Sequence, residues 1–436
     1  MIGRFVSGPW VTLAMLALST PAGSIHAQTP PALQSFAEFV GGLTAARADH
    51  FVDQPARAAV SGGSDQFVAQ PAHAAVSDAS EFEAMRRHLL ALYQGVTVRH
   101  SYVLDHQIFD CVPVLQQPSL RLAGVPQAAS PPPVSPGSGR QGVLSLPPGS
   151  RDQLGNLQSC QDGEIPMRRV TLDEVTRFRT LREFLRKEPN AAVADNHQYA
   201  YEYQEVNNNG GLSVLSLWKP YVDISLSEVF SLCQQWYLGG AAAQLQSAEV
   251  GWQNYPQKWG TEDSVLFVYW TADDYVNTGC YNLECPGFVQ TNKNLQLGVG
   301  FSQYSTDGGP MLELYAGYHF YKGNWWLWVG GAYMGYIKGT SYNGGQLSKS
   351  AQQILFGGET VGATEWPPMG SGQFANTRAR EAAYQRDIVY WNTADVIFNA
   401  KLTAVDASPS CYTTDASGVA IWGTYFFFGG PGGKTC

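Results

Sequence analysis

Residues 311–320 read MLELYAGYHF, and residues 325–337 read WWLWVGGAYMGYI. Aromatic and aliphatic side chains fill both runs, and a turn containing Gly separates them, which is typical of neighbouring β-strands. Similar runs recur between His197 and the C-terminus: SVLSLW (213–218), VLFVYW (265–270), LQLGVGFSQY (295–304), QILFGGETVG (353–362) and VAIWGTYFFFGG (419–430). No long helical pattern interrupts them. This arrangement predicts an all-β domain over residues 190–436, built as an antiparallel sandwich or barrel.

The composition agrees with a β-rich chain and excludes some partners. The chain of 436 residues has 46 Gly, 22 Tyr, 20 Phe and 12 Trp, and only 14% of its residues are charged. Its net charge is −9, so Lys and Arg are not in excess. Nucleic acids and anionic membranes both select clustered cations, so neither is an expected partner.

Residues 1–27 predict a signal peptide. Arg4 supplies the positive start, residues 10–18 form the apolar centre, and Ala27 is a small residue before the cleavage point. A membrane anchor needs ~20 apolar residues, whereas Pro21 ends this run earlier. The protein is therefore expected to be secreted or periplasmic, where disulfides can form.

The chain has seven cysteines, so at least one thiol stays unpaired or bonds another chain. They are Cys111, Cys160, Cys233, Cys280, Cys285, Cys411 and Cys436. No CxxC motif or Cys/His cluster indicates a zinc site, so disulfides are their favoured use.

Residues 28–80 are expected to be a weakly structured, low-complexity linker. They contain a polar, Ala-rich tandem repeat that begins at Phe51 and again at Phe67. Two copies are too few for a solenoid. We interpret the repeat as a duplication within a linker.

Residues 81–189 predict a smaller α+β region. One helix begins in a capping box formed by Ser80 and Glu83, and a second begins near Thr171 with Glu174 as its capping partner. Each carries an apolar face, made by Phe82, Met85, Leu89 and Leu92 in the first and by Val175, Phe178, Leu181 and Leu185 in the second.

The same region contains a strand-like segment and two connectors. Residues 96–112 resemble a strand, and residues 127–142 are too rich in Pro, Gly and Ser to pack. Pro189 is expected to end the second helix. Residues 186–196, RKEPNAAVADN, are then expected to form an exposed connector to the β-domain.

The β-domain lacks the motifs of several hydrolase classes. It contains no HExxH and no GxSxG, and its two histidines are His197 and His319. It also contains no Walker loop and no dinucleotide-binding glycine motif. Hydrolytic acid–base chemistry in this domain would therefore depend mainly on carboxylates.

Two glutamates have distinctive contexts. Glu249 lies in the strand-like segment LQSAEVGWQNY, where alternation places Ser247, Gly251 and Gln253 on its face. Glu359 follows two glycines in QILFGGETVG, and glycines in a strand allow another backbone to approach. Without further information, each could equally be an ordinary outward-facing strand residue. The tryptophans of WWLW are expected to pack in the core.

At these residues the chain resembles the neprosin family of glutamic prolyl endopeptidases. The matching strings, in order, are SAEVGW, YWTADDYVNTGCYNLECPGF, GNWWLWVG, ILFGGET, MGSGQF and YFFFGGPGG. Upstream, IFDCV and CQDGEIPMRR resemble the activation-peptide region of the family. The resemblance extends from about Arg99 to the C-terminus.

This resemblance implies a catalytic β-sandwich of two large antiparallel sheets, with Glu249 and Glu359 as the catalytic pair. It implies no metal or organic cofactor, and substrates that are proline-containing peptides or proteins. It also implies disulfides that join Cys280 to Cys285, Cys411 to Cys436 and, in the activation region, Cys111 to Cys160. Cys233 would then be free.

The chain departs from the family pattern at two positions, where Cys233 replaces Ser and Gln373 replaces His. The second departure puts the substrate preference in question. A non-catalytic, lectin-like β-sandwich that binds glycans through its aromatic residues is the main alternative, and a glycosidase that uses the same carboxylates is another.

A glutamic peptidase mechanism follows from placing two carboxylates at one site. Because like charges raise one pKa, one glutamate stays protonated while the other is ionised at mildly acidic pH. The ionised glutamate activates water, and the protonated one polarises the scissile carbonyl and then protonates the leaving amine. The sequence does not assign these roles. Cleavage after Pro189 is the expected processing step, because the surrounding connector is polar.

Overall fold

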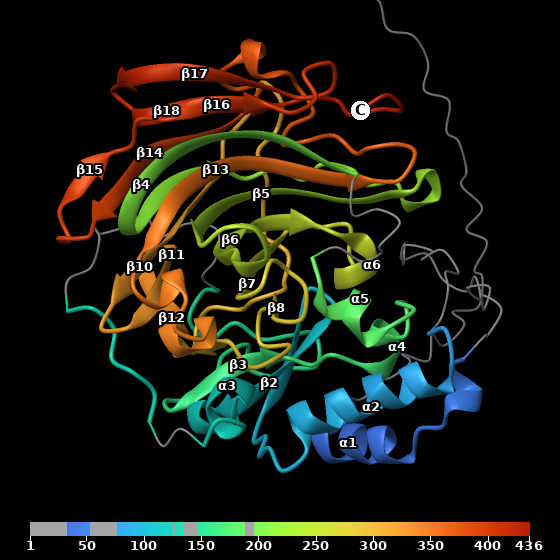
Figure 1. Cartoon of the computed structure of the whole chain (residues 1–436). Helices are drawn as coiled ribbons and strands as arrows, with labels where there is room; N and C mark the ends of the chain where they lie inside the picture. The colour runs from blue at the N-terminus through green and yellow to red at the C-terminus, as the bar shows by residue number, and fades with distance from the viewer. Residues whose placement is uncertain (1–32, 53–75, 125–126, 134–145, 188–195) are drawn as a thin grey trace, which may run out of the picture. The chain divides into compact units, whose positions relative to one another are not determined.

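The computed structural model describes residues 33–52, 76–124, 127–133, 146–187 and 196–436 (Figure 1). Within this part, residues Gln34–Cys436 form one compact unit. The expected signal peptide, most of the tandem repeat and Pro189 lie outside the described residues. No helix in the described part of the chain is long and apolar enough to cross a bilayer.

The N-terminal region combines helices with a small sheet. Its helices are α1 (Phe36–Ala45), α2 (Ala79–Tyr93), α3 (Pro118–Arg121), α4 (Leu172–Val175) and α5 (Leu181–Leu185). Its three antiparallel strands are β1 (Ser101–Leu104), β2 (Gln107–Pro113) and β3 (Glu164–Arg168), in that order across the sheet. Helices α1 and α2 lie side by side (Figure 1).

The structure corrects the expectations for this region in three places. Helix α1 packs its buried Phe39 and Leu43 into the core, so the expectation of weak structure is wrong for Gln34–Val52. Helix α2 is capped by Asp78, whose carboxylate accepts from two backbone amides, so Ser80 is not the N-cap. An aspartate at this position satisfies the free amides of the first turn as well as a serine would.

The predicted second helix is two short helices. Thr171 caps α4 in the expected capping box with Glu174. The chain then turns, and Thr180 caps α5 separately by accepting from the backbone amide of Glu183. Two threonine caps nine residues apart therefore divide a segment whose apolar spacing alone predicts one helix.

The first described strand of the β-domain begins at His197. Its strands are β4 (His197–Ser216), β5 (Glu228–Gly239), β6 (Gln246–Asn254), β7 (Val265–Thr271), β8 (Cys280–Tyr281), β9 (Phe288–Gln290), β10 (Glu313–Tyr321), β11 (Asn324–Val329), β12 (Ala332–Lys338), β13 (Ala351–Gly362), β14 (Ala383–Asn392), β15 (Ile397–Asn399), β16 (Thr403–Asp406), β17 (Thr413–Ala420) and β18 (Gly423–Gly429). One short helix, α6 (Pro256–Trp259), follows β6. The run LQLGVGFSQY is mostly irregular, so its assignment as a strand is wrong.

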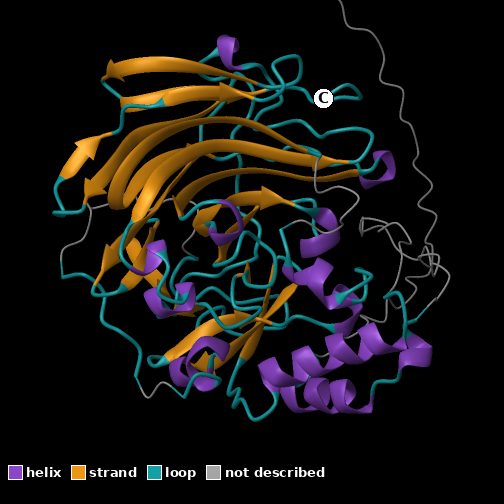
Figure 2. Ribbon diagram, viewed as in Figure 1, coloured by secondary structure: helices purple, strands orange, loops and turns teal. Residues whose placement is uncertain are grey.

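Strand β4 connects two groups of strands. Its first half pairs with β13 and β16, and its second half pairs with β10 and β14. The path β8-β7-β6-β5-β13 extends from the first half, and β10-β11-β12-β9 extends from the second. All these pairings are antiparallel, and the long strands curve together (Figure 2). The predicted fold class, an antiparallel β-sandwich preceded by a smaller α+β region, is confirmed.

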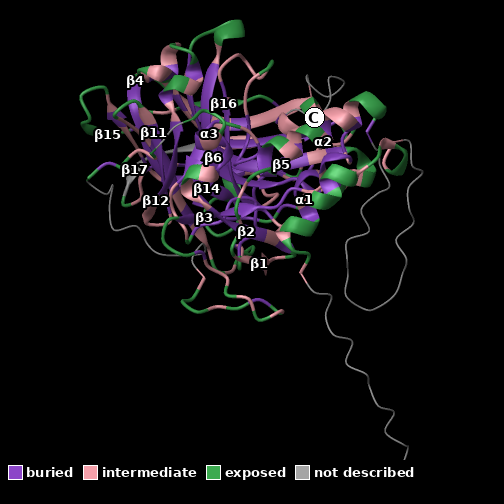
Figure 3. Cartoon of the chain, turned by 90° about the horizontal axis from the view of Figure 1, so that it is seen from below, coloured by how far each residue is buried: buried purple, intermediate pink, exposed green. Residues whose placement is uncertain are grey.

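Aromatic side chains form much of the core. The buried residues are concentrated in the strands at the centre of the molecule (Figure 3). Trp325, Trp326 and Trp328 are all buried, which confirms the expectation that they pack in the core. The three disulfides implied by the family resemblance are present, between Cys111 and Cys160, Cys280 and Cys285, and Cys411 and Cys436. Cys233 is buried and not in a disulfide.

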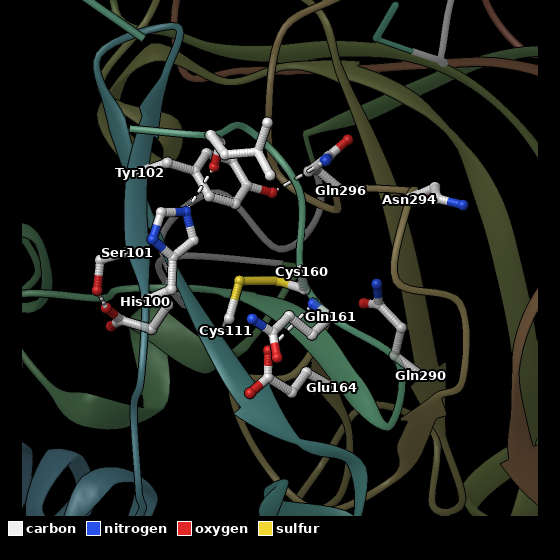
Figure 4. Close-up of a disulfide and its surroundings, with 12 residues drawn as sticks. His100, Ser101, Tyr102, Cys111, Cys160, Gln161, Glu164, Gln290, Asn294 and Gln296 are labelled. Atoms are coloured by element: carbon white, nitrogen blue, oxygen red, sulfur yellow. Dashed lines mark hydrogen bonds between the residues drawn. A yellow bond between two sulfur atoms is a disulfide. The ribbon is translucent and has the colours of Figure 1, made fainter. Parts of the chain in front are cut away.

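The first disulfide lies where the N-terminal region meets the β-domain. Cys111, on β2, bonds Cys160 in the segment before β3 (Figure 4). Beside it, Tyr102 on β1 accepts a hydrogen bond of 3.0 Å from the Gln296 amide of the β-domain (Figure 4). The disulfide thus stabilises a part of the small sheet that contacts the β-domain.

Strand β4 buries an acidic residue, Glu202, that does not belong to the predicted glutamate pair. Glu202 is 2% exposed, and its Oε1 has no hydrogen-bond partner in the described part of the chain. Burial, together with the nearby charges of Asp406 and Asp415, raises the pKa of Glu202 to about 8. The folded protein therefore binds a proton there more tightly than the unfolded chain does. The stability that this tighter proton binding gives to the folded state is complete below pH 4.5 and is lost as the pH rises through about 8.

We predict that Glu202→Gln raises the melting temperature at pH 9 by several degrees and leaves it nearly unchanged at pH 4. The amide mimics the protonated acid, so it removes the cost of a buried charge only where the wild type would be ionised. Thermal unfolding at both pH values measures this, with the exposed Glu205→Gln on the same strand as control. Equal shifts at the two pH values would contradict the assignment of a protonated Glu202.

Candidate active site

Glu249 and Glu359 project from the same face of the sheet. Glu249 lies on β6 and pairs with Trp236 on β5, while Glu359 lies on β13 and pairs with Leu232 on the same β5. Directly opposite residues share a face, and Leu232 and Trp236 are four residues apart, so all four side chains point to one side. Both glutamates are buried, which excludes the alternative that they are ordinary outward-facing residues.

The β-domain holds one oxygen of each carboxylate. Glu249 Oε1 accepts hydrogen bonds from the hydroxyls of Ser247 and Tyr275, each at 2.7 Å. Glu359 Oε1 lies 2.6 Å from His197 Nδ1 and accepts a longer bond of 3.4 Å from the Tyr199 hydroxyl. These contacts fix both carboxylates through Oε1. Each Oε2 faces another group, and Glu359 Oε2 also accepts a longer bond of 3.3 Å from the Gln234 amide of β5.

The other group is the ammonium of Lys187, two residues beyond the end of α5. Its Nζ lies 2.9 Å from Glu249 Oε2 and 2.6 Å from Glu359 Oε2. The side chain is 4% exposed, and its ammonium lies 5.4 Å from the centre of the Trp236 ring. Residues 186–196 were expected to be exposed, and for Lys187 that expectation is wrong. A buried site with two carboxylates needs a cation, and this lysine supplies it.

The charges of the three groups depend on one another. Burial alone would raise the pKa of Glu359, but the Lys187 charge and the hydrogen bond from His197 outweigh it and lower that pKa to about 2. Burial alone would lower the pKa of Lys187, but the two glutamates outweigh it and raise that pKa above its ordinary value. In this state Lys187 and Glu359 are both charged at every pH between about 4.5 and 10.5.

A strained loop delivers Tyr275 to Glu249. Asp274 and Tyr275 have φ angles of 56° and 60°, which is rare for residues with a side chain. Asp273 stabilises the loop by accepting from the backbone amides of Asn277 and Thr278. Strain of this kind persists where the surrounding structure holds it, and it is common at functional sites.

The N-terminal region makes a second buried ionic contact with the β-domain. Lys258 of α6 donates to Glu284 at 2.5 Å and to the carbonyl oxygen of Phe184 in α5 at 2.7 Å. Arg168 of β3 bonds the same Glu284 at 3.4 Å. His88 of α2 lies 2.8 Å from the Glu284 carbonyl oxygen, and burial lowers the pKa of its ring to about 4.

The remaining predicted positions lie away from these contacts. Cys233 accepts a hydrogen bond from the Gln385 amide, and burial raises the pKa of its thiol, so it is an unreactive core residue. Gln373 donates to Asp307. No cluster of His, Cys, Asp or Glu within the described ranges could hold a metal ion.

Sequence reasoning missed most of the residues that surround the glutamates. Ser247 was placed on the correct face by alternation, but Lys187, His197, Tyr199 and Tyr275 were not identified as partners. In the sequence, Lys187 is marked by its position two residues before Pro189, the expected processing site. The other three lie far from the glutamates in sequence, or on a loop, so no local pattern indicates them.

The fold and the paired carboxylates define an all-β domain with a candidate two-glutamate active site. Residues 227–431, less than half of the chain, match the protein-family model Neprosin. The match includes both Glu249 and Glu359, and it excludes the N-terminal region that carries Lys187.

Solved structures of similar fold are distant. Scytalido-glutamic peptidase with a transition-state analogue inhibitor has 10% identity and a TM-score of 0.29, and covers 55% of this chain and 99% of its own. SCP-B of the Eqolisin family, in complex with the tripeptide Ala-Ile-His, has 10% identity, a TM-score of 0.27 and the same coverage. CG-16, a homodimeric agglutinin from chicken liver, has 9% identity and a TM-score of 0.19, and covers 36% of this chain and 90% of its own. At sequence identities and TM-scores this low, the similarity supports no conclusion about function.

We predict that Lys187→Met reverses the pH dependence of stability. Without the cation, two buried carboxylates face each other, so one of them must take up a proton. Breaking a buried ion pair costs about 3–5 kcal/mol, and this cost should appear at pH 7 and diminish towards pH 4. Thermal unfolding of the full-length variant and of the full-length wild type at both pH values, with the intact mass checked before each scan, measures this. Lys219→Met, at an exposed ion pair, is the control. A loss of stability that is equal at pH 4 and pH 7 would contradict the shared-cation geometry.

Proposed function

We propose that this chain is the exported proenzyme of an acid-active glutamic endopeptidase that cleaves on the C-terminal side of proline. The observation that carries the proposal is the single Lys187 ammonium held between the Oε2 atoms of Glu249 and Glu359. The match to the Neprosin family supports the peptidase class. The preference for proline rests on the family resemblance.

The proposed reaction begins when Lys187 leaves the two carboxylates. One of them then takes up a proton, because two buried like charges cannot both persist. Of the four groups that hold the Oε1 atoms, only His197 can carry a positive charge, so Glu359 is the carboxylate that stays ionised. Glu359 takes a proton from water as the water oxygen attacks the scissile carbonyl. Glu249 polarises that carbonyl, and a proton then passes to the leaving amine.

Lys187 would keep the proenzyme inactive in two ways. Its ammonium occupies the space between the two reactive oxygens, where water and the scissile carbonyl would have to lie. Its charge also compensates the negative charge of the pair, so the pair has less need to bind the proton that the reaction requires. Substrate access and the protonation state are thus both controlled by one side chain of the N-terminal region.

Acidification would weaken the docking of the N-terminal region in two steps. His88 has a folded pKa of about 4, below its ordinary 6.5, so its contribution to stability is complete above pH 6.5 and is lost as the pH falls through about 4. Glu359 has a folded pKa of about 2, below its ordinary 4.5, so its contribution is complete above pH 4.5 and is lost as the pH falls through about 2. Release is therefore expected to begin below pH 6.5.

We predict that Glu249→Gln and Glu359→Gln each lower kcat on a proline-containing peptide by ~10²–10⁴-fold or more. Each change keeps the shape of the side chain and removes its ability to exchange a proton. The wild type should be most active at acidic pH and inactive near neutrality, and Glu205→Gln should match it. Near-normal turnover by either active-site variant between pH 3 and 7 would refute the assignment.

We predict that the proenzyme cleaves itself near Pro189 when it is moved from pH 7 to pH 4. Pro189 follows Lys187 by two residues, so cleavage there would separate the blocking lysine from the β-domain. N-terminal sequencing of the product identifies the site, with the Glu359→Gln proenzyme incubated alone as control. Processing of that variant at the wild-type rate, or a mature N-terminus well inside β4, would argue against self-processing.

A further inference from the structure

Gln234 stands between the two glutamates on the same face of the sheet. It lies on β5, two residues from Leu232, which pairs with Glu359, and two residues from Trp236, which pairs with Glu249. Alternation therefore points its side chain to the side of the glutamates, in the row between them. Gln234 is fully buried, and the acid–base cycle described above gives it no part.

The two residues opposite Gln234 have no side chains. They are Gly251 on β6 and Gly357 on β13. A Cβ atom at Gly251 would lie 2.0 Å from the Cys233 carbonyl oxygen, and one at Gly357 would lie 2.4 Å from the Ala200 carbonyl oxygen. The packing of the neighbouring strands thus excludes side chains there. On these three strands, the amide of Gln234 alone fills the row that separates the glutamates.

The amide of Gln234 is only partly used in this state. Its Nε2 carries two donor hydrogens and, among the described residues, makes one contact of 3.3 Å, to Glu359 Oε2, the oxygen that also binds Lys187. Its Oε1, an acceptor, has no hydrogen-bond partner among the described residues. Gln253, on the same face one strand away, shows the contrast. Its Nε2 donates to the Tyr281 hydroxyl at 3.0 Å, and its Oε1 accepts from the Trp259 indole at 3.2 Å. Hydrogen-bonding groups of a buried amide that lack partners cost free energy, unless another state of the protein supplies those partners.

We propose that Gln234 is a further catalytic residue, which donates a hydrogen bond from Nε2 to the carbonyl oxygen of the substrate as that oxygen becomes negative. This inference rests on the proposed peptidase function. As the bond between the water oxygen and the carbonyl carbon forms, the water proton passes to Glu359 and the carbonyl π electrons move to the oxygen. Glu249 and Gln234 both donate to that oxygen. When the intermediate collapses, the C–N bond breaks and the amine takes a proton from the glutamates.

The other hydrogen-bonding side chains of the β-domain around the site already contact the Oε1 atoms of the two glutamates. Ser247 and Tyr275 bind Glu249 Oε1, and His197 and Tyr199 contact Glu359 Oε1. Gln234 instead contacts an Oε2 atom, on the side where Lys187 lies. Its amide is neutral at every pH at which the enzyme would work, so it can donate without adding a titration step of its own. A fixed donor of this kind typically contributes ~10²–10³-fold to kcat.

The test compares Gln234→Met with Gln253→Met, prepared as full-length chains and matured by a trace of tagged wild-type enzyme that is then removed. For Gln234→Met we expect kcat to fall ~10²–10³-fold and KM to change little. The pH dependence of kcat should have the same shape as that of the wild type. The affinity for a hydrated peptide difluoroketone, which mimics the tetrahedral intermediate, should fall by the same factor. The affinity for a product peptide should stay unchanged. Gln253→Met should lose thermal stability instead.

A second variant protects the test against misfolding. Gln234→Glu keeps the shape, and its carboxyl can donate only when protonated. We expect it to recover part of its activity towards low pH along a new titration limb. The inference would be overturned if kcat of Gln234→Met stayed within ~3-fold of the wild-type value. It would also be overturned if the pH–activity profile of Gln234→Glu showed no additional titration. Equal losses of product and difluoroketone affinity would do so too, because they would indicate a structural role. An inactive wild type would instead refute the proposed function itself.

Discussion

The arrangement of the site depends on one constraint: two buried carboxylates on one face of a sheet cannot both stay charged without a cation. In this state the cation is Lys187, which contacts both Oε2 atoms. The β-domain fixes the two Oε1 atoms with its own donors, and the two Oε2 atoms face the lysine ammonium that lies between them. The N-terminal region thus completes the electrostatics of a site that it also blocks.

The same constraint explains why the surrounding strands have the residues they have. Strand β5 lies between the strands of the two glutamates and places Gln234 in the row that separates them. Glycines flank it because the backbones of neighbouring strands leave no space for a Cβ atom. Gly357 and Gly358, the two glycines before Glu359, were predicted to allow a substrate backbone to approach. For Gly357 the structure gives a nearer reason, since a side chain there would collide with β4.

Much of the fold could be predicted from sequence because its determinants are local. Alternating apolar residues and glycine turns located most strands from β4 to β18, and capping patterns located α4. The errors have physical causes. An aspartate two residues upstream caps α2 in place of Ser80, and a second threonine cap divides the last predicted helix. Helix α1 had a local signal, since Ser35 and Glu38 form a capping box before the buried Phe39 and Leu43. It was missed because residues 28–80 were interpreted together as one polar linker.

The candidate site was predictable only in part. Glu249 and Glu359 were identified from strand context and family resemblance, and the structure brings them together. Lys187 was expected to be solvated, because a lysine beside Pro189 in a polar segment usually is. Its burial depends on two glutamates that follow it by 62 and 172 residues, so only the tertiary structure reveals it. His197 and Tyr275 likewise reach the glutamates through strand pairing and a strained loop.

The central claim is that Lys187 sets the protonation of the glutamate pair, and the most direct measurement is the titration of the two carboxyl groups. Glutamate side chains labelled with ¹³C at the carboxyl carbon, assigned through the Glu→Gln variants, can be followed by NMR between pH 2 and pH 8. The account predicts that Glu359 of the full-length chain stays largely ionised down to the lower end of this range, because its pKa is about 2. After removal of the N-terminal region, one carboxyl of the pair should titrate well above that value. Identical titration curves before and after removal would contradict the account.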